Sequence, residues 1–233
     1  MRLAIISDIH SNLEALNKSL SIIDSRKVDS ILCLGDVVGY GANPNECVEI
    51  VKKRCSTVLL GNHDAAAIDL TIAKQFTTYA RLSAEWTAGH LLPEHRSFLE
   101  SLPLTSSKEG VFLVHASPFE PSEWYYIVSI LDARQAFAHF SEEICFVGHS
   151  HLPGVFGETS ESQQVARGER FVVNVGSVGQ PRDGNPKLSF GVFDTDRWEY
   201  ENVRAEYEIK RASQKILDAG LPRALADRLW AGV

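Results

Sequence analysis

The chain has 233 residues, of which 44% are hydrophobic and 23% charged, and its formal net charge is −7. At this length an α/β domain buries enough apolar surface to fold without disulfides or structural zinc, and the four cysteines form no Cys-x-x-Cys pair. An acidic surface repels polyanions, so we expect no binding to extended nucleic acid, although a local cationic site could accept a small phosphorylated substrate. The N-terminal apolar run is too short for a signal peptide, and no stretch reaches the about 20 apolar residues that span a bilayer. We therefore expect a cytoplasmic protein that does not bind membranes.

Seven short apolar runs have the composition of buried strands. They are continuous in apolar residues rather than alternating, which indicates sheets covered on both faces. The order of strand, helix and strand in the first half predicts right-handed crossovers and a largely parallel sheet, and the strands from residue 144 onward predict a second, mixed sheet. The expected strands are Leu3–Ser7, Ser30–Leu34, Thr57–Leu60, Val111–Val114, Ile144–Val147, Phe171–Val175 and Leu188–Phe193.

Helical patterns separate the early strands. Ser11 and Glu14 have the spacing of a capping box at the start of one helix, and Asn43 with Pro44 provides an N-cap and a first-turn proline for another. The stretch 65–100 has no strand signal, and we expect it to form a helical cap within a single domain of residues 1–233. Two C-terminal helices are expected at Ile209–Ala219 and Arg223–Trp230.

Metal-capable side chains follow five of the expected strands. In chain order these segments are Asp8-Ile9-His10, Gly35-Asp36, Gly61-Asn62-His63-Asp64, His115 and Gly148-His149-Ser150-His151. In open α/β sheets, ligands bind beyond the carboxyl ends of the strands, so we expect these groups to meet. Imidazole with carboxylate suits Mn, Fe, Co, Ni or Zn better than Ca, and the lack of a nearby thiolate argues against a structural zinc site. So many ligands are too many for one ion and suit two ions that share a bridge.

The ordered set DxH, GD, GNHD, a single His and GHxH resembles the calcineurin-like metallophosphoesterase family. Each motif alone has an ordinary structural interpretation, such as a helix cap for Asp8 or a core histidine for His115, but five motifs in this order are highly specific. The resemblance implies a four-layer αββα sandwich in which helices flank two mixed sheets. It also implies that Asp8, His10 and His151 hold one metal ion, that Asn62, His115 and His149 hold the other, and that Asp36 bridges both.

The same resemblance implies hydrolysis of a phosphate ester or anhydride by a hydroxide that bridges the two divalent ions. We expect manganese, and iron, zinc, cobalt and nickel also suit these ligands. In the family, the histidine equivalent to His63 protonates the leaving alkoxide. Some members carry a second aspartate shortly after the GD motif that orients this histidine, but the segment here reads GDVVGY. Asp64 or a backbone carbonyl is then the candidate for that role.

Three further residues are candidates for substrate contacts, and two of them have a purely structural alternative. Arg182 lies in a Gly/Pro-rich loop and could reach a phosphate oxygen, unless it is merely solvated. Asn12 lies where a helix N-terminus could face an anion. Tyr125, within Trp124-Tyr125-Tyr126, could stack on a nucleobase or could anchor a loop in the core.

The chain length and the loop at residues 176–182 are most similar to small bacterial phosphodiesterases and to diadenosine tetraphosphate hydrolases. We therefore expect a phosphodiester or phosphoanhydride substrate, such as diadenosine tetraphosphate or another nucleotide. A non-catalytic scaffold that uses this fold to bind proteins is the alternative, but family scaffolds lack the histidine that is present here as His63. A metal-dependent amide hydrolase would use similar ligands, and the GNHD tetrapeptide argues against it.

Overall fold

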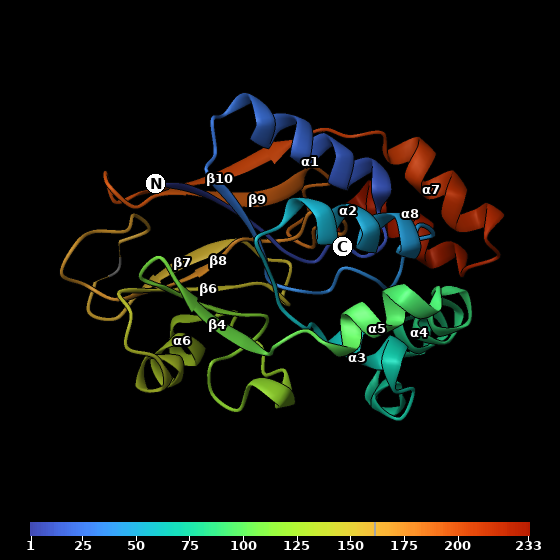
Figure 1. Cartoon of the computed structure of the whole chain (residues 1–233), viewed down its shortest axis with the longest axis horizontal. Helices are drawn as coiled ribbons and strands as arrows, with labels where there is room; N and C mark the ends of the chain where they lie inside the picture. Colours follow the sequence, from blue (N-terminus) through green and yellow to red (C-terminus); the bar gives the residue numbers. More distant parts are fainter. Residues whose placement is uncertain (161) are drawn as a thin grey trace.

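The computed structural model describes residues 1–160 and 162–233, which form two five-stranded sheets packed face to face (Figure 1). The strands are β1 Arg2–Ile6, β2 Ser30–Cys33, β3 Thr57–Val58, β4 Thr105–Lys108, β5 Val111–Val114, β6 Ile144–Val147, β7 Gly154–Gly157, β8 Phe171–Asn174, β9 Leu188–Asp194 and β10 Glu199–Ala205. The first sheet has the order β10-β9-β1-β2-β3, and the second has the order β4-β5-β6-β8-β7. Both sheets are mixed.

The helices are α1 Leu13–Ser25, α2 Pro44–Arg54, α3 Asn62–Ile68, α4 Thr78–His90, α5 Pro93–Glu100, α6 Ile130–Ala136, α7 Ile209–Asp218 and α8 Arg223–Ala231. Three short 3-10 turns, η1 Ile72–Gln75, η2 Pro121–Glu123 and η3 Phe137–His139, complete the secondary structure of the described residues. None of the helices among those residues combines the length and apolar composition that crossing a membrane requires.

Three apolar cores hold four layers together. Leu16 of α1 and Val48 of α2 pack on the outer face of the first sheet. Ile5 and Phe146 lie in the core between the sheets, while Phe137 belongs to the core that α6 shares with the outer face of the second sheet. The predicted αββα sandwich is therefore confirmed.

The first sheet differs from expectation in how it closes. Strands β1, β2 and β3 are parallel, as predicted. However, β9 runs antiparallel to β1, and β10 pairs with β9 at the edge of the same sheet. The expectation that all the late strands belong to the second sheet is therefore wrong for β9.

The start of α1 also differs from the predicted capping box. The N-cap is Asn12, whose side-chain oxygen accepts the backbone N–H of Ala15 at 3.1 Å. Glu14 instead pairs with Lys215 of α7 at 2.6 Å, because the C-terminal helices pack beside α1. The second predicted cap is confirmed in position, since α2 begins at Pro44 after Asn43, but the Asn43 side chain donates to Glu46 Oε1 at 2.8 Å and caps no backbone N–H.

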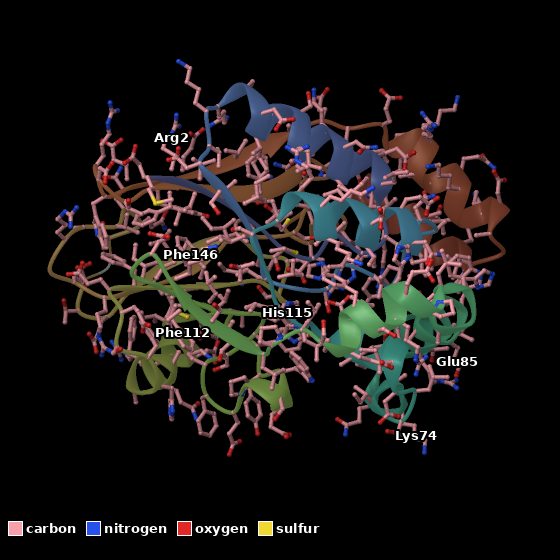
Figure 2. The ribbon with its side chains drawn as sticks, viewed as in Figure 1. Arg2, Lys74, Glu85, Phe112, His115 and Phe146 are labelled. Carbon is pink, nitrogen blue, oxygen red and sulfur yellow. The ribbon has the colours of Figure 1, made fainter. Side chains whose placement is uncertain are left out.

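The parallel strands of both sheets point toward one end of the molecule. There, α3, α4 and α5 gather on one side, and α7 and α8 on the other (Figure 1). Figure 2 shows His115 at the end of the second sheet nearer to these helices, whereas Arg2 lies at the opposite end of the molecule.

Candidate metal centre

The five strand-end motifs converge at this end of the two sheets. Six of their side chains form two groups, and within each group the candidate ligand atoms lie within 4.8 Å of one another. All six side chains are buried. The first group is Asp8, His10 and His151, and the second is Asp36, His115 and His149. Each group combines residues from both sheets, so the site forms only when the two sheets pack.

Several of these residues have a left-handed backbone, which is uncommon outside glycine and costs about 1–3 kcal/mol each. Backbone hydrogen bonds between neighbouring loops hold this conformation: Asp8 N–H donates to Gly35 O and His10 N–H to Asp36 O, both at 3.0 Å. Such strain is concentrated at functional sites. The positive φ angles are 54° at Asp8, 50° at His10, 52° at Asp36, 63° at His149 and 62° at His151.

Backbone carbonyls orient three of the imidazoles. In each case the carbonyl can only accept a hydrogen bond, so Nδ1 carries a proton. In the neutral form of the ring, which is the form that binds a metal ion, the lone pair of Nε2 then points into the site. Metal-binding histidines use this arrangement. The pairs are His10 with Val38 O at 3.1 Å, His115 with Leu34 O at 3.1 Å, and His151 with Gln180 O.

The site contains acceptors that face one another. The Nε2 atoms of His10 and His151 are 3.0 Å apart, and Asp8 Oδ1 is 3.2 Å from His151 Nε2. Asp8 Oδ1 and His149 Nε2 are buried without a hydrogen-bond partner among the described residues. Converging lone pairs require a positive charge between them, so the residues present fit divalent cations.

Asp36 lies between the two groups. Its Oδ2 is 3.7 Å from His10 Nε2 and 3.4 Å from His115 Nε2, and its Oδ1 accepts the backbone N–H of His63 at 2.8 Å. A Cβ atom at Gly61 would lie 2.1 Å from Asp36 Oδ1, which explains the glycine of the GNHD motif. Asp36 is thus placed to contact an ion in either group.

Burial and charge set the protonation of these groups. Burial opposes ionisation of Asp36, but the facing His115 and His63 outweigh it and hold the pKa of this carboxyl well below its ordinary value. Burial also opposes protonation of His115, and Asp36 outweighs it, so the pKa of His115 rises to about 9. Burial lowers the pKa of His149 to about 3. At neutral pH, Asp36 and His149 are thus in the states that bind a metal ion, whereas His115 must lose a proton.

Asn62 and His63, at the start of α3, complete the candidate set. Asn62 Oδ1 is 3.2 Å from His115 Nε2, beside the second group. The ring of His63 packs at centroid distances of 4.4 Å from Tyr40 and 4.7 Å from Phe76. The structure therefore brings His63 and all seven predicted ligands to one place.

Neither candidate for orienting His63 is supported. The Asp64 carboxylate accepts the N–H groups of Val38 and Gly61, and His63 Nδ1 has no hydrogen-bond partner among the described residues. A Cβ atom at Gly39 would lie 2.7 Å from His63 Nδ1. A side chain at position 39, three residues after the aspartate of the GD motif, would therefore collide with the His63 ring where it now lies. The His63 ring packs against Tyr40 and Phe76 instead.

A cavity of about 360 Å³ opens beside His63 and His149. Its aromatic wall includes Tyr126, whose ring stacks on His149 at 4.1 Å and 20°. The described residues that line it are Tyr40, Asn62, His63, Gln75, Phe76, Thr77, Ala80, Glu123, Trp124, Tyr126, His149, Arg182, Arg228 and Val233.

The three predicted substrate contacts have different positions. Arg182 lines the cavity, where its Nη2 donates to Gln180 Oε1 at 3.0 Å. Tyr125 is not among the lining residues, and its ring stacks on Phe119 at 5.6 Å. The Asn12 amide is engaged by the protein, since it caps α1 and donates to Gly179 O at 2.8 Å. The cavity geometry therefore supports Arg182 as a substrate contact, whereas Tyr125 and Asn12 stay predictions without support from it.

Most residues that line the cavity were not singled out by the sequence, and Phe76, Tyr126 and Arg228 are examples. Phe76 lies in a turn between helices, Tyr126 is adjacent to the tyrosine that was selected, and Arg228 belongs to a helix far along the chain. The aromatic run at residues 124–126 pointed to the correct loop but could not identify which ring faces the cavity.

Known proteins resemble this chain in sequence. The sequence model of the calcineurin-like phosphoesterase superfamily domain matches residues 1–197. The uncharacterised protein MJ0912 of Methanocaldococcus jannaschii is 40% identical, and the match covers 99% of this chain and 98% of that protein. The phosphodiesterase YfcE of Escherichia coli is 27% identical, with 84% and 89% covered.

A solved structure extends the match to three dimensions. The crystal structure of a metallophosphoesterase from Sphaerobacter thermophilus is 39% identical with a TM-score of 0.89, and the match covers 100% of this chain and 99% of that one. The chain belongs to the calcineurin-like phosphoesterase superfamily and is a metal-dependent phosphoesterase.

Proposed function

We propose that the enzyme uses two divalent cations to hydrolyse a phosphodiester or phosphoanhydride bond of a small nucleotide. The position of Asp36 carries this proposal, because its carboxylate lies between two groups of imidazoles that both have lone pairs to offer. Asp8, His10 and His151 would hold one ion, Asn62, His115 and His149 the other, and Asp36 would bridge them. When bound, such ions supply a nucleophile at neutral pH and positive charge against the phosphoryl oxygens. We expect manganese in both positions.

His63 is proposed to donate the proton that the leaving oxygen needs. It lines the cavity next to the candidate ligand Asn62. Burial lowers its pKa to about 4, so the ring is neutral in the protein alone at pH 7. An anionic substrate favours the imidazolium and raises this pKa, which would supply the proton when the phosphate is bound.

The cavity supports a substrate with both a ring and phosphate. Phe76 and Tyr126 offer aromatic faces, and Arg182 offers a cation. Cavities of about 300–1,000 Å³ bind small organic ligands, so a volume of about 360 Å³ suits one nucleotide unit of a substrate such as diadenosine tetraphosphate. Because the segment 72–80 forms one wall, we propose that the helical stretch 65–100 is the cap of a single domain. The cytoplasmic location stays a prediction.

A hydrolysis panel tests this function. The purified protein is supplied with Mn²⁺ or with a chelator, and offered an aryl phosphomonoester, an aryl phosphodiester and diadenosine tetraphosphate. We expect hydrolysis that needs the metal and is faster with the diester or the dinucleotide than with the monoester. Activity that survives chelation would refute the two-metal mechanism, and a protein that binds metal but hydrolyses no phosphate ester would favour the scaffold alternative.

A further inference from the structure

The C-terminal helices lie beyond the family domain but contribute to its cavity. The superfamily match ends at residue 197, and α7 and α8 follow it. Arg228, in the last turn of α8, lines the same cavity as His63 and Arg182. This part of the chain can therefore affect which substrates bind without altering the metal centre.

Helix α8 is fixed against the loop that carries Arg182. One face of the helix is buried through Leu225 and Leu229, in a core that includes Tyr40. The backbone carbonyl of Gly232 accepts the N–H of Gly184 at 2.9 Å, two residues after Arg182. These contacts hold the backbones that carry both arginines in one rigid unit.

The acidic neighbours of these two arginines are engaged by other cations. Asp183, next to Arg182, forms a two-point ion pair with Arg204 at 2.5 and 3.1 Å. Asp227, next to Arg228, faces Arg223 at 3.5 Å. Within residues 1–160 and 162–233, neither Arg182 nor Arg228 has a carboxylate within 4.0 Å, so both charges are free for a ligand.

The cavity therefore contains two arginines that have no ion-pair partner among the described residues, although the chain is acidic. Outside the metal centre, the described lining residues with a negative charge are Glu123 of η2 and Val233, which carries the terminal carboxylate, and both are exposed. Arg182 is pre-oriented by Gln180 and by Tyr40 Oη at 3.3 Å. A planar guanidinium held in this way binds phosphate oxygens through paired N–H groups.

We propose that Arg228 and Arg182 together bind a phosphate group other than the one that is hydrolysed. The inference rests on the proposed function, because it places the reacting phosphate at the metal centre and a second phosphate at the arginines. It narrows the substrate class to nucleotides with at least two linked phosphates, in preference to simple phosphodiesters. Arg228 is then a specificity-determining residue supplied by α8.

The experiment compares two substrates that both contain a nucleoside. The p-nitrophenyl ester of thymidine 5′-monophosphate has one phosphate, and diadenosine tetraphosphate has four. Rates are measured at saturating free Mn²⁺ for the unaltered protein and for Arg228→Gln. We expect the substitution to lower kcat/KM for the tetraphosphate about tenfold more than for the single-phosphate ester, mainly by raising KM. Arg228→Lys keeps the charge but not the planar guanidinium, so its kcat/KM for the tetraphosphate should lie between those of the unaltered protein and Arg228→Gln.

Arg223→Gln is the matched control, because it removes an exposed arginine from the same helix and should leave the ratio of the two kcat/KM values within about twofold. Equal losses for both substrates in Arg228→Gln, or no loss, would overturn the inference, and so would an unaltered protein that cleaves only the single-phosphate ester. An unaltered protein that cleaves neither substrate would instead refute the proposed function. Melting temperatures of the variants show whether each is folded.

Discussion

In the metal-free protein, the ring of His115 should be protonated on both nitrogens, and so positively charged, at neutral pH. Both of its ring nitrogens face acceptors: Nδ1 is 3.1 Å from Leu34 O, and Nε2 is 3.4 Å from Asp36 Oδ2 and 3.2 Å from Asn62 Oδ1. Burial opposes the charged ring, but Asp36 outweighs burial and raises the pKa of His115 to about 9. A metal ion that binds through Nε2 must displace this proton.

The expected effect on metal affinity follows from that value. The pKa of His115, about 9, lies about two units above pH 7. Displacing the proton at pH 7 therefore costs about 2.7 kcal/mol, which lowers the metal affinity about a hundredfold. The affinity of the second group should therefore rise about tenfold per pH unit between pH 6.5 and 8.5, and level off above the pKa of His115. His149 adds nothing to this slope, because burial lowers its pKa to about 3 and it is already neutral.

Two measurements check this reasoning. Nitrogen-15 NMR of the imidazole rings in the metal-free protein should show a charged His115 at pH 7 beside a neutral His149. Calorimetric titrations with Mn²⁺ at several pH values should give the slope. In Asp36→Asn the attraction is lost and burial dominates, so the pKa of His115 should fall below its ordinary value. A neutral His115 at pH 7 in the unaltered protein would refute the account of the site's electrostatics.

Three substitutions test the roles of single residues. Asp36→Asn should abolish turnover and weaken binding of both ions by more than the roughly 10–100-fold typical of an outer-sphere partner, as read from metal content after dialysis. His63→Ala should keep both ions and slow hydrolysis about 10²–10⁴-fold, most strongly for poor leaving groups. The control His90→Ala, in a helix away from the site, should have no effect. Loss of metal in the His63 variant would contradict the assignment of His63 as the proton donor. Gly61→Ala should lower the melting temperature by several degrees and reduce activity, because the new methyl group overlaps the Asp36 carboxylate, and a fully active, equally stable variant would contradict the packing.

The central strands were predictable because burial on both faces leaves a continuous apolar run. All three strands that the sequence analysis missed, β4, β7 and β10, lie at sheet edges. Strand β4 reads TSSK and β10 reads EYENVRA, with partly exposed side chains that resemble those of a loop. An edge strand is defined by its neighbour rather than by its own composition. The short helix α6 did carry a local signal, a capping box of Ser129 and Asp132, which was overlooked.

The candidate ligands were predictable for a related reason. Each follows a strand, and the geometry of a sheet brings strand ends together whatever lies between them in the chain. No comparable rule predicts which residues line the cavity. Phe76 and Arg228 reach it from helices placed by tertiary packing, and helical periodicity alone can only assign a residue to a polar or an apolar face.

The strained backbones at the site require a rigid support that does not depend on metal. Each group of candidate ligands combines residues from both sheets, and the loops that carry them are held by backbone hydrogen bonds such as that from Gly148 N–H to His115 O at 2.9 Å. The core between the sheets, which includes the fully buried Ile5 and Phe146, fixes the separation of the strand ends. The burial of apolar surface can thus offset the cost of left-handed residues and closely spaced acceptors. The ions would then bind to ligands already in position, so little binding energy is lost to ordering the site.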